Sequence, residues 1–178
     1  MAPLRIPFAR GEEVNDEKPK TEYARFDGEA EFQSAVERLI GQPGRELRIF
    51  DPDLSALRVN SPERIALLEK FLRASRTRRI QIVLHDTEHL SRYCPRMLGL
   101  LKLFTHAMQI NRTSDEIRNL QDAFLVLDAQ HYVRRPVARF FRGAVALNDD
   151  NEGLAMRTRF QEIWAASFPA VSSTTVGL

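Results

Sequence analysis

Cysteine is almost absent from this chain: Cys94 is the single cysteine among 178 residues. An internal disulfide bond and a zinc site made of several thiolates are therefore excluded. A chain without disulfides is typical of a reducing compartment, so we expect a cytoplasmic protein. Cys94 lies between Arg92 and Arg96, whose charges could activate its thiol, but a half-buried structural cysteine explains the residue more simply.

Long hydrophobic runs are also lacking. No stretch approaches the roughly 18 apolar residues that a membrane-spanning helix needs, so we expect no membrane span. Residues 1–10 contain no continuous apolar segment of the kind found in secretory signals, and acidic residues follow them. The 43% hydrophobic and 28% charged residues are ordinary for a folded domain.

Lysine is scarce, because only four of the 26 basic residues are lysines. Arginine can bind phosphate or carboxylate groups with two parallel hydrogen bonds, which lysine cannot do. A GC-rich gene gives the same bias, however, and the net charge is only +2. Dedicated nucleic-acid-binding domains are usually strongly basic, so nucleic acid is an alternative partner and not the favoured one.

The pattern along the chain predicts one domain with two flanking arms. Residues 1–25 are polar, charged and without periodicity, and they are expected to form a flexible N-terminal arm. Residues 169–178 also lack a pattern and are expected to form a flexible tail. The region between them, residues 26–168, is long enough for one folded domain with its own core.

Helical and strand patterns alternate within residues 26–168. Amphipathic helices are expected at residues 27–40, 62–72, 95–108 and 152–167, and strands at residues 47–50, 79–84, 108–110, 123–127, 132–133 and 140–147. Residues 123–127 are continuously apolar, as in a central strand covered on both faces. The alternation predicts the α/β class, with a mixed, mostly parallel sheet and helices on both faces.

Two histidines follow the strand at residues 79–84. His85 and His89 are four residues apart with Asp86 and Glu88 between them, a set that could hold a divalent metal. His85 is expected to end the strand, however, and Asp86 can cap the next helix, so the two rings need not face each other. We therefore expect no metal and no cofactor, and keep His85 and His89 as weak metal candidates.

Other charged residues suggest two further sites. Arg134, Arg135 and Arg142 could bind phosphate on one surface, and another basic cluster lies at a helix end (Arg73, Arg76, Arg78 and Arg79), where it also complements the helix dipole. Asp51 and Asp53 flank Pro52 after a strand. They could form an acid and base pair, but a turn-forming role is far more common for this pattern.

The order of these elements resembles one half of the phospholipase D-like superfamily. That family carries His-x-Lys followed by four residues and Asp on a central strand, and the same spacing here reads Gln121, Ala123 and Asp128. The helix and strands before this motif and the closing helix with Phe160 and Trp164 are similar as well, over residues 26–168. The resemblance implies a bacterial, single-motif member with a phospholipase D-like half fold. Because active members pair two motif halves, it also implies a homodimer.

The substitutions in the motif decide the expected function. In the family the histidine attacks phosphorus, whereas the amide of Gln121 is not nucleophilic and Ala123 brings no charge to a phosphate. We therefore expect a non-catalytic domain with a binding, accessory or assembly role, with a second copy or another protein as partner. One alternative is a phosphodiester-cleaving or metal-dependent hydrolase that uses His85 and His89. The other is an arginine-rich nucleic-acid-binding domain.

Overall fold

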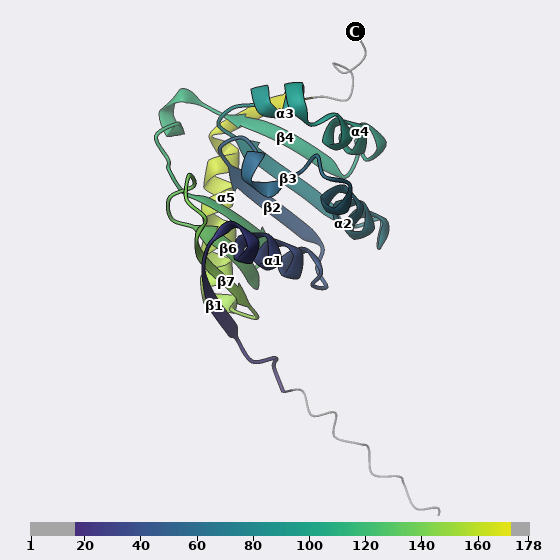
Figure 1. The fold of residues 1–178 in the computed structure, drawn as a ribbon. Coiled ribbons are helices and arrows are strands. Elements are labelled where there is room, and N and C mark those ends of the chain that lie inside the picture. Colours follow the sequence, from purple (N-terminus) through teal and green to yellow (C-terminus); the bar gives the residue numbers. More distant parts are fainter. Residues whose placement is uncertain (1–16, 172–178) are drawn as a thin grey trace, which may run out of the picture.

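The apolar runs and amphipathic stripes of the sequence form one sheet covered by helices (Figure 1). The computed structural model describes residues 17–171. The strands are β1 (Glu22–Asp27), β2 (Glu46–Asp51), β3 (Arg79–Leu84), β4 (Met108–Thr113), β5 (Ala123–Leu127), β6 (His131–Arg135), β7 (Arg142–Leu147) and β8 (Ser167–Val171). The helices are α1 (Glu29–Ile40), α2 (Pro62–Arg73), α3 (Glu88–Tyr93), α4 (Pro95–Leu103) and α5 (Asp150–Ala165), with short 3-10 turns η1 (Ser55–Leu57) and η2 (Asp115–Ile117). Every helix in this range is too short or too polar to cross a membrane.

The eight strands lie in the order β1-β7-β6-β5-β2-β3-β4-β8. The mixed α/β sheet is confirmed, but the expected parallel majority is wrong. Only the pairs β2–β3 and β3–β4 are parallel, and every other neighbouring pair is antiparallel. The reason lies in the connection from β4 to β5. It contains η2 and no crossover helix, so the chain stays at the same end of the sheet and β5 runs back beside β2.

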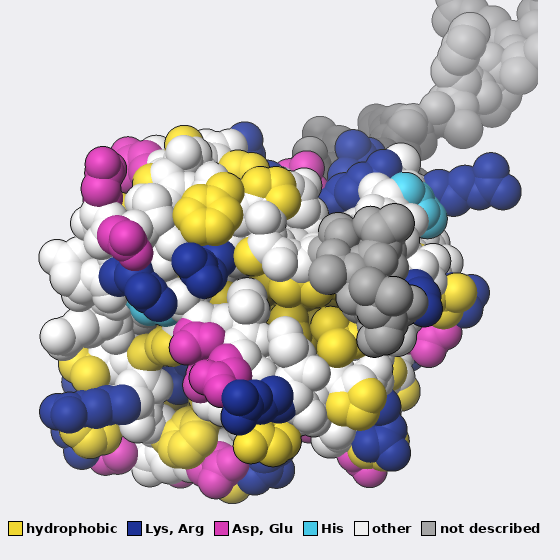
Figure 2. Space-filling view, turned by 90° about the horizontal axis from the view of Figure 1, so that it is seen from above, with side chains coloured by type: hydrophobic (Ala, Val, Ile, Leu, Met, Phe, Trp, Pro, Cys, Tyr) yellow, Lys and Arg dark blue, Asp and Glu magenta, His cyan; other side chains and the backbone are white. Residues whose placement is uncertain are grey.

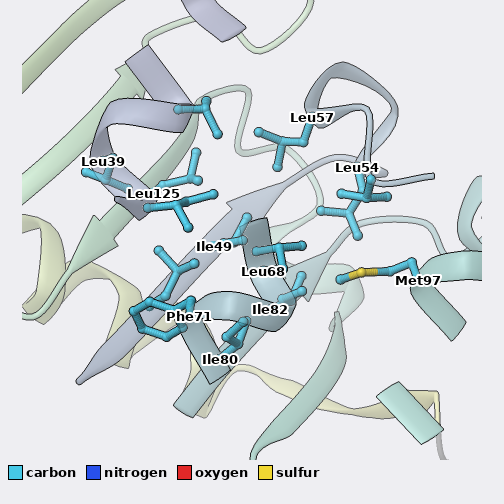
Figure 3. Close-up of a cluster of buried hydrophobic side chains, with 14 of the residues drawn as sticks. Leu39, Ile49, Leu54, Leu57, Leu68, Phe71, Ile80, Ile82, Met97 and Leu125 are labelled. Carbon is cyan, nitrogen blue, oxygen red and sulfur yellow. The ribbon is translucent and has the colours of Figure 1, made fainter. Parts of the chain in front are cut away.

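Helices cover both faces, as expected. Helices α1, α2, α3 and α4 pack on the face that Figure 1 presents, and α5 packs alone behind the sheet. Side chains alternate between the two layers, so Ile49 of β2 contacts the first layer and Phe50 contacts the α5 layer. Figure 3 shows the first layer, where leucines and isoleucines of the sheet meet Leu68 and Phe71 of α2. Strand β5 is buried along its whole length in the sheet centre, which confirms its predicted position.

Strands β1 and β8 form the two edges of the sheet and extend the domain at both ends. Part of the arm expected at residues 1–25 therefore lies in β1, and the tail expected from residue 169 begins inside β8. Residues 1–16 and 172–178 of these segments lie outside the described residues. Phe26 is the one buried residue of β1. Both strands consequently lack the apolar alternation by which a strand is recognised.

Candidate functional site

Two of the three motif positions, Gln121 and Ala123, lie at one end of the sheet, where β2 and β6 end and β5 begins. We call the surroundings of Asp51, Gln121, Ala123 and Arg135 the motif edge. Gln121 is exposed just before β5, and its backbone oxygen accepts a hydrogen bond from the backbone N–H of Ala138 at 2.7 Å. Ala123 is buried as the first residue of β5. The positions of the family's histidine and lysine are thus adjacent in space but differ completely in exposure.

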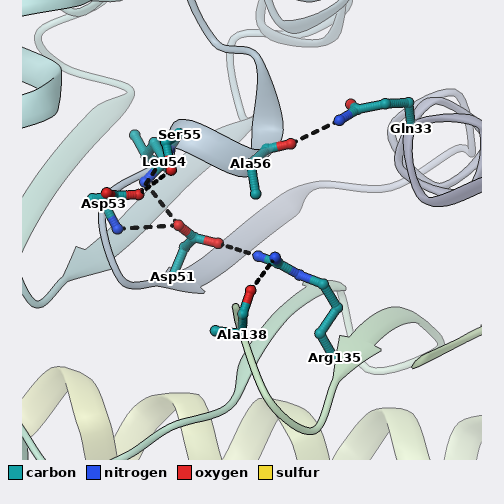
Figure 4. Close-up of polar contacts among 8 residues, drawn as sticks. All are labelled: Gln33, Asp51, Asp53, Leu54, Ser55, Ala56, Arg135 and Ala138. Atoms are coloured by element: carbon teal, nitrogen blue, oxygen red, sulfur yellow. Dashed lines mark hydrogen bonds and ion pairs between the residues drawn. The ribbon is translucent and has the colours of Figure 1, made fainter. Parts of the chain in front are cut away.

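A buried ion pair crosses the motif edge beside Ala123. Ala123 and Arg135 are direct partners between β5 and β6, and Asp51 follows Phe50, whose partner in β5 is Phe124. The three residues therefore form one row across three strands. Arg135 donates a hydrogen bond to Asp51 at 2.6 Å, and their side chains are only 3% and 2% exposed (Figure 4). The small side chain of Ala123 leaves the space through which the arginine reaches the aspartate.

Further contacts hold both members of this pair. The guanidinium of Arg135 also donates to the backbone oxygen of Ala138 and lies over the ring of Phe32 in α1, 4.5 Å from its centroid. The second carboxylate oxygen of Asp51 accepts backbone N–H groups of Asp53 and Leu54 at 3.1 and 2.7 Å. These bonds shape the turn after β2, in agreement with the turn-forming role expected for Asp51.

The pair is nevertheless costly to bury. Burial raises the pKa of Asp51 above its ordinary value, although the charge of Arg135 and the two backbone N–H groups act in the opposite direction. Burial likewise lowers the pKa of Arg135, against the attraction of Asp51. Each charge therefore depends on the other, because either one alone would be a buried and uncompensated charge.

His85 lies at the same end of the sheet but on the opposite face, with its ring edge-on to Phe50 at a centroid distance of 5.3 Å. Its two ring nitrogens are 2.8 Å from the hydroxyl of Thr113 and from the backbone oxygen of Leu120. Because a carbonyl oxygen only accepts, Nε2 donates to Leu120, and Nδ1 is engaged by the hydroxyl of Thr113. Both ring nitrogens are thus occupied by protein contacts and neither is open to a metal or to a phosphorus centre.

His89 is not brought together with His85. It lies on α3, where its ring is 5.5 Å from that of Tyr93 between centroids. Within residues 17–171, no group of three or more histidine, cysteine or acidic side chains is placed to hold a metal ion. The spacing in the sequence suggested that the two histidines could share one site. In the structure His85 directly follows β3 and His89 lies on α3, and their rings contact different residues.

A second ion pair near the motif was not recognised from the sequence. Arg159 of α5 donates to Asp122 at 2.7 Å, and the aspartate side chain is 10% exposed. Asp122 directly precedes β5 and faces α5 through this pair, whereas Ala123 lies in the row of Asp51 and Arg135 on the other face. The only sequence signal was a charged residue beside a continuously apolar strand.

Asp128 lies at the other end of β5, away from Gln121. Its Oδ1 accepts backbone N–H groups of Arg45 and Glu46 at 3.0 and 2.9 Å, which ties the turn after β5 to the start of β2. Its φ of 55° is left-handed, a conformation that aspartate tolerates better than most residues. Asp128 thus makes the kind of backbone contacts expected of an aspartate at a strand-to-turn junction.

Replacing Asp128 with alanine should lower the free energy of unfolding by about 2 kcal/mol, because two backbone N–H groups lose their acceptor and the left-handed turn becomes strained. Chemical denaturation of both proteins would measure the loss. Asp128→Asn is the matched control, since asparagine keeps one acceptor oxygen and tolerates this backbone conformation. An alanine variant as stable as the asparagine variant would contradict this role.

The three arginines expected to share a phosphate-binding surface are divided between two places. Arg135 is buried in its ion pair with Asp51, so the expected surface role does not fit its position. Arg134 and Arg142 line one groove on the α5 side of the sheet. Arg142 pairs there with Asp27 at 3.3 Å, whereas the side chain of Arg134 has no hydrogen-bond or ion-pair partner among the described residues.

The comparisons with known proteins agree with this architecture. The family described as "Domain of unknown function (DUF7931)" matches residues 28–173. No curated protein sequence matches the chain. Among solved structures, the phospholipase D family member Nuc from Salmonella typhimurium is similar, with a TM-score of 0.62 and 11% identity over 86% of this chain and 100% of Nuc. NucT from Helicobacter pylori gives a TM-score of 0.57 and 12% identity over 85% of this chain and all of NucT.

One further similar structure is larger. The archaeal chromatin protein TrmBL2, which is described as showing a novel mode of DNA binding, has a TM-score of 0.63 and 13% identity to this chain. The match covers 88% of this chain and 57% of TrmBL2, so the chain spans just over half of that protein. At such identities these likenesses show the fold alone, and the fold is phospholipase D-like.

Proposed function

Because the chain belongs to the family described as Domain of unknown function (DUF7931), we propose its role from the site: it is a non-catalytic phospholipase D-like domain used for binding or assembly. The observation that carries this proposal is the buried Asp51–Arg135 pair beside Ala123. The pair occupies the motif edge, where a catalytic site of the phospholipase D-like superfamily would need an accessible lysine that binds phosphate. Gln121 beside it cannot attack phosphorus.

The hydrolase alternative is less well supported by the geometry. It requires a free ring nitrogen on His85 or a cluster of metal ligands, but both nitrogens of His85 are engaged by Thr113 and Leu120. His131 is near Asp128 in the sequence and is buried at the end of β5 that lies away from Gln121. Its Nδ1 accepts the backbone N–H of Asn148 at 3.0 Å. Burial lowers the pKa of His131, so it is neutral near pH 7 but has no lone pair to spare.

The nucleic-acid-binding alternative is also less well supported. In the basic cluster after α2, Arg78 and Arg79 donate to backbone oxygens and Arg73 pairs with Glu69. Figure 2 views the molecule from the end at which α3 lies, and basic and acidic side chains are interspersed over that face. A strong polyanion-binding surface would instead show basic groups gathered in one continuous field.

Hydrolysis assays test the proposal directly. The purified chain should release no product above a buffer control from bis(p-nitrophenyl) phosphate, phospholipid vesicles or single-stranded DNA. Any product should be equal in parallel preparations of the wild type, His85→Ala and His131→Ala, as expected for a contaminant. Turnover in the wild type that disappears in either histidine variant would overturn the non-catalytic proposal.

A further inference from the structure

A groove on the α5 side of the sheet shares the β6–β7 loop with the motif edge but lies on the face opposite to the Asp51–Arg135 pair. Helix α5 packs against β2, β5 and β6, and the outer strands β7 and β1 extend past it. The resulting hollow has a volume of about 990 Å³ and includes residues of β1, β6 and β7 and of the β6–β7 loop. This volume is at the upper end of the range of ligand sites, roughly 300–1,000 Å³. We call it the β1–β7–β6 groove.

The strand register places matched side chains on the two walls of this groove. Tyr23 of β1 and Tyr132 of β6 are both direct partners of Ala146 in β7. In the next row on the same face, Arg25 and Arg134 are both direct partners of Ala144. Because partners across a sheet point to the same face, two tyrosines and two arginines flank a floor of alanines.

The two arginines of this row form no ion pair within residues 17–171, although acidic side chains lie along the same groove. Neither Arg25 nor Arg134 forms an ion pair or a side-chain hydrogen bond there, and the Nε of Arg134 is buried without an acceptor. The enclosed Nε of Arg134 does not reach the groove, but the other N–H groups of Arg134 and those of Arg25 also have no acceptor within residues 17–171, and an anion in the groove would supply one. The two residues are about 10 Å apart across one intervening strand, so both guanidinium groups can reach one phosphate.

Aromatic side chains lie exposed along the same groove. Tyr23 is 57% exposed and Phe140 is 52% exposed, and both line the hollow. Such rings bind the flat face of a planar heterocycle by stacking. The groove therefore combines an anion site with two surfaces for a planar ring.

Acidic side chains limit what the groove can accept. Asp27, Glu31, Asp149 and Glu152 lie along it as well, and they would repel a chain of successive phosphates. Carboxylates do accept hydrogen bonds from sugar hydroxyl groups. We propose that the β1–β7–β6 groove binds one nucleotide, with its phosphate on Arg25 and Arg134 and its base against Tyr23 and Phe140. This site lies on the opposite face of β6 from Arg135 and does not depend on whether the motif edge is catalytic.

Calorimetric titration of the full chain with adenosine 5′-monophosphate tests the site. Arg25→Gln should weaken binding about tenfold, since it removes a charge-assisted contact, and Arg134→Gln should do the same. Arg25 is exposed, so its variant should fold normally even if Arg134→Gln does not. Tyr23→Ala should also weaken binding. Arg76→Gln and Tyr93→Ala change exposed residues outside the groove and should leave the dissociation constant unaltered.

Three comparison ligands make the test decisive. Adenosine and inorganic phosphate should each bind more weakly than the nucleotide. Adenosine keeps only the contacts of the base with the aromatic rings, and inorganic phosphate keeps only the contacts with the two arginines. An oligothymidylate should compete with the nucleotide only weakly, because the acidic side chains along the groove repel successive phosphates. No binding of the nucleotide at millimolar concentration would overturn the proposal. So would equal binding of inorganic phosphate, or an oligothymidylate that displaces the nucleotide as effectively as unlabelled adenosine 5′-monophosphate does.

Discussion

Replacing Arg135 with methionine is expected to lower the free energy of unfolding by about 3–5 kcal/mol, because the Asp51 carboxylate would remain buried without its partner. Both side chains of the pair are almost fully enclosed, and the hydrogen bond between them is 2.6 Å long. Methionine retains the length of the arginine side chain but not the guanidinium that lies over Phe32 and donates to Ala138, so the loss would report the charge together with these contacts. Urea denaturation followed by circular dichroism would measure it.

Two comparisons separate this electrostatic loss from a packing defect. Arg139→Met changes a neighbouring exposed arginine and should alter stability by less than about 0.5 kcal/mol. The double variant Asp51→Asn/Arg135→Met should lose less stability than the sum of the two single changes, since neither charge is then left alone. Additive losses would contradict the coupling of the pair.

The stability of Arg135→Met should also depend on pH in a defined direction. Burial already raises the pKa of Asp51 above its ordinary value of 3.8, and removal of the arginine raises it further. The folded state then binds a proton more readily than the unfolded chain does, so folding is favoured as the pH falls. The stability deficit relative to the wild type should therefore shrink when the pH is lowered from 7 towards 4.

Ala123→Lys is expected to destabilise the protein by about 3 kcal/mol or more, although it restores a residue type of the phospholipase D motif. The new side chain would enter the row that Arg135 crosses to reach Asp51, where it crowds the pair and adds a like charge in a buried place. Gln121→His, at the exposed neighbouring motif position, should change stability by less than about 0.5 kcal/mol.

Melting temperatures of the two motif variants would show the contrast between the buried position 123 and the exposed position 121. If Ala123→Lys is tolerated as well as Gln121→His, the motif edge has more room than the Asp51–Arg135 pair leaves, and the main support for a non-catalytic role would be lost. If the predicted difference is found, restoring the motif requires the ion pair to be removed at the same time.

The central part of the fold was predictable because its signals are strong. The continuous apolar run of residues 123–127 is strand β5, and the amphipathic helix expected at residues 62–72 is α2, where the Ser61 hydroxyl accepts the backbone N–H of Arg64 as an N-cap. Strand directions were not predictable in the same way. They depend on whether the β4–β5 connection returns to the other end of the sheet or stays at the same end, and no local sequence pattern indicates which of the two occurs.

The edge strands and the buried ion pair escaped prediction for two different reasons. Strand β1 has a single buried side chain, and β8 contains Pro169 and is mostly exposed, so neither carries an alternating pattern. Asp51 and Arg135 are 84 positions apart in the chain. Each looked like a turn or surface residue by itself, and only the register of β2, β5 and β6 brings them together.

The position of β1 has a consequence for how the chain folds. β1 pairs along its whole length with β7, so that Glu22 lies opposite Leu147. A contact between such distant residues forms only after a long loop has closed, which slows folding. During synthesis β1 leaves the ribosome first among the strands but has no partner until β7 has followed it. Of the whole sheet, its first strand is therefore among the last to become hydrogen-bonded.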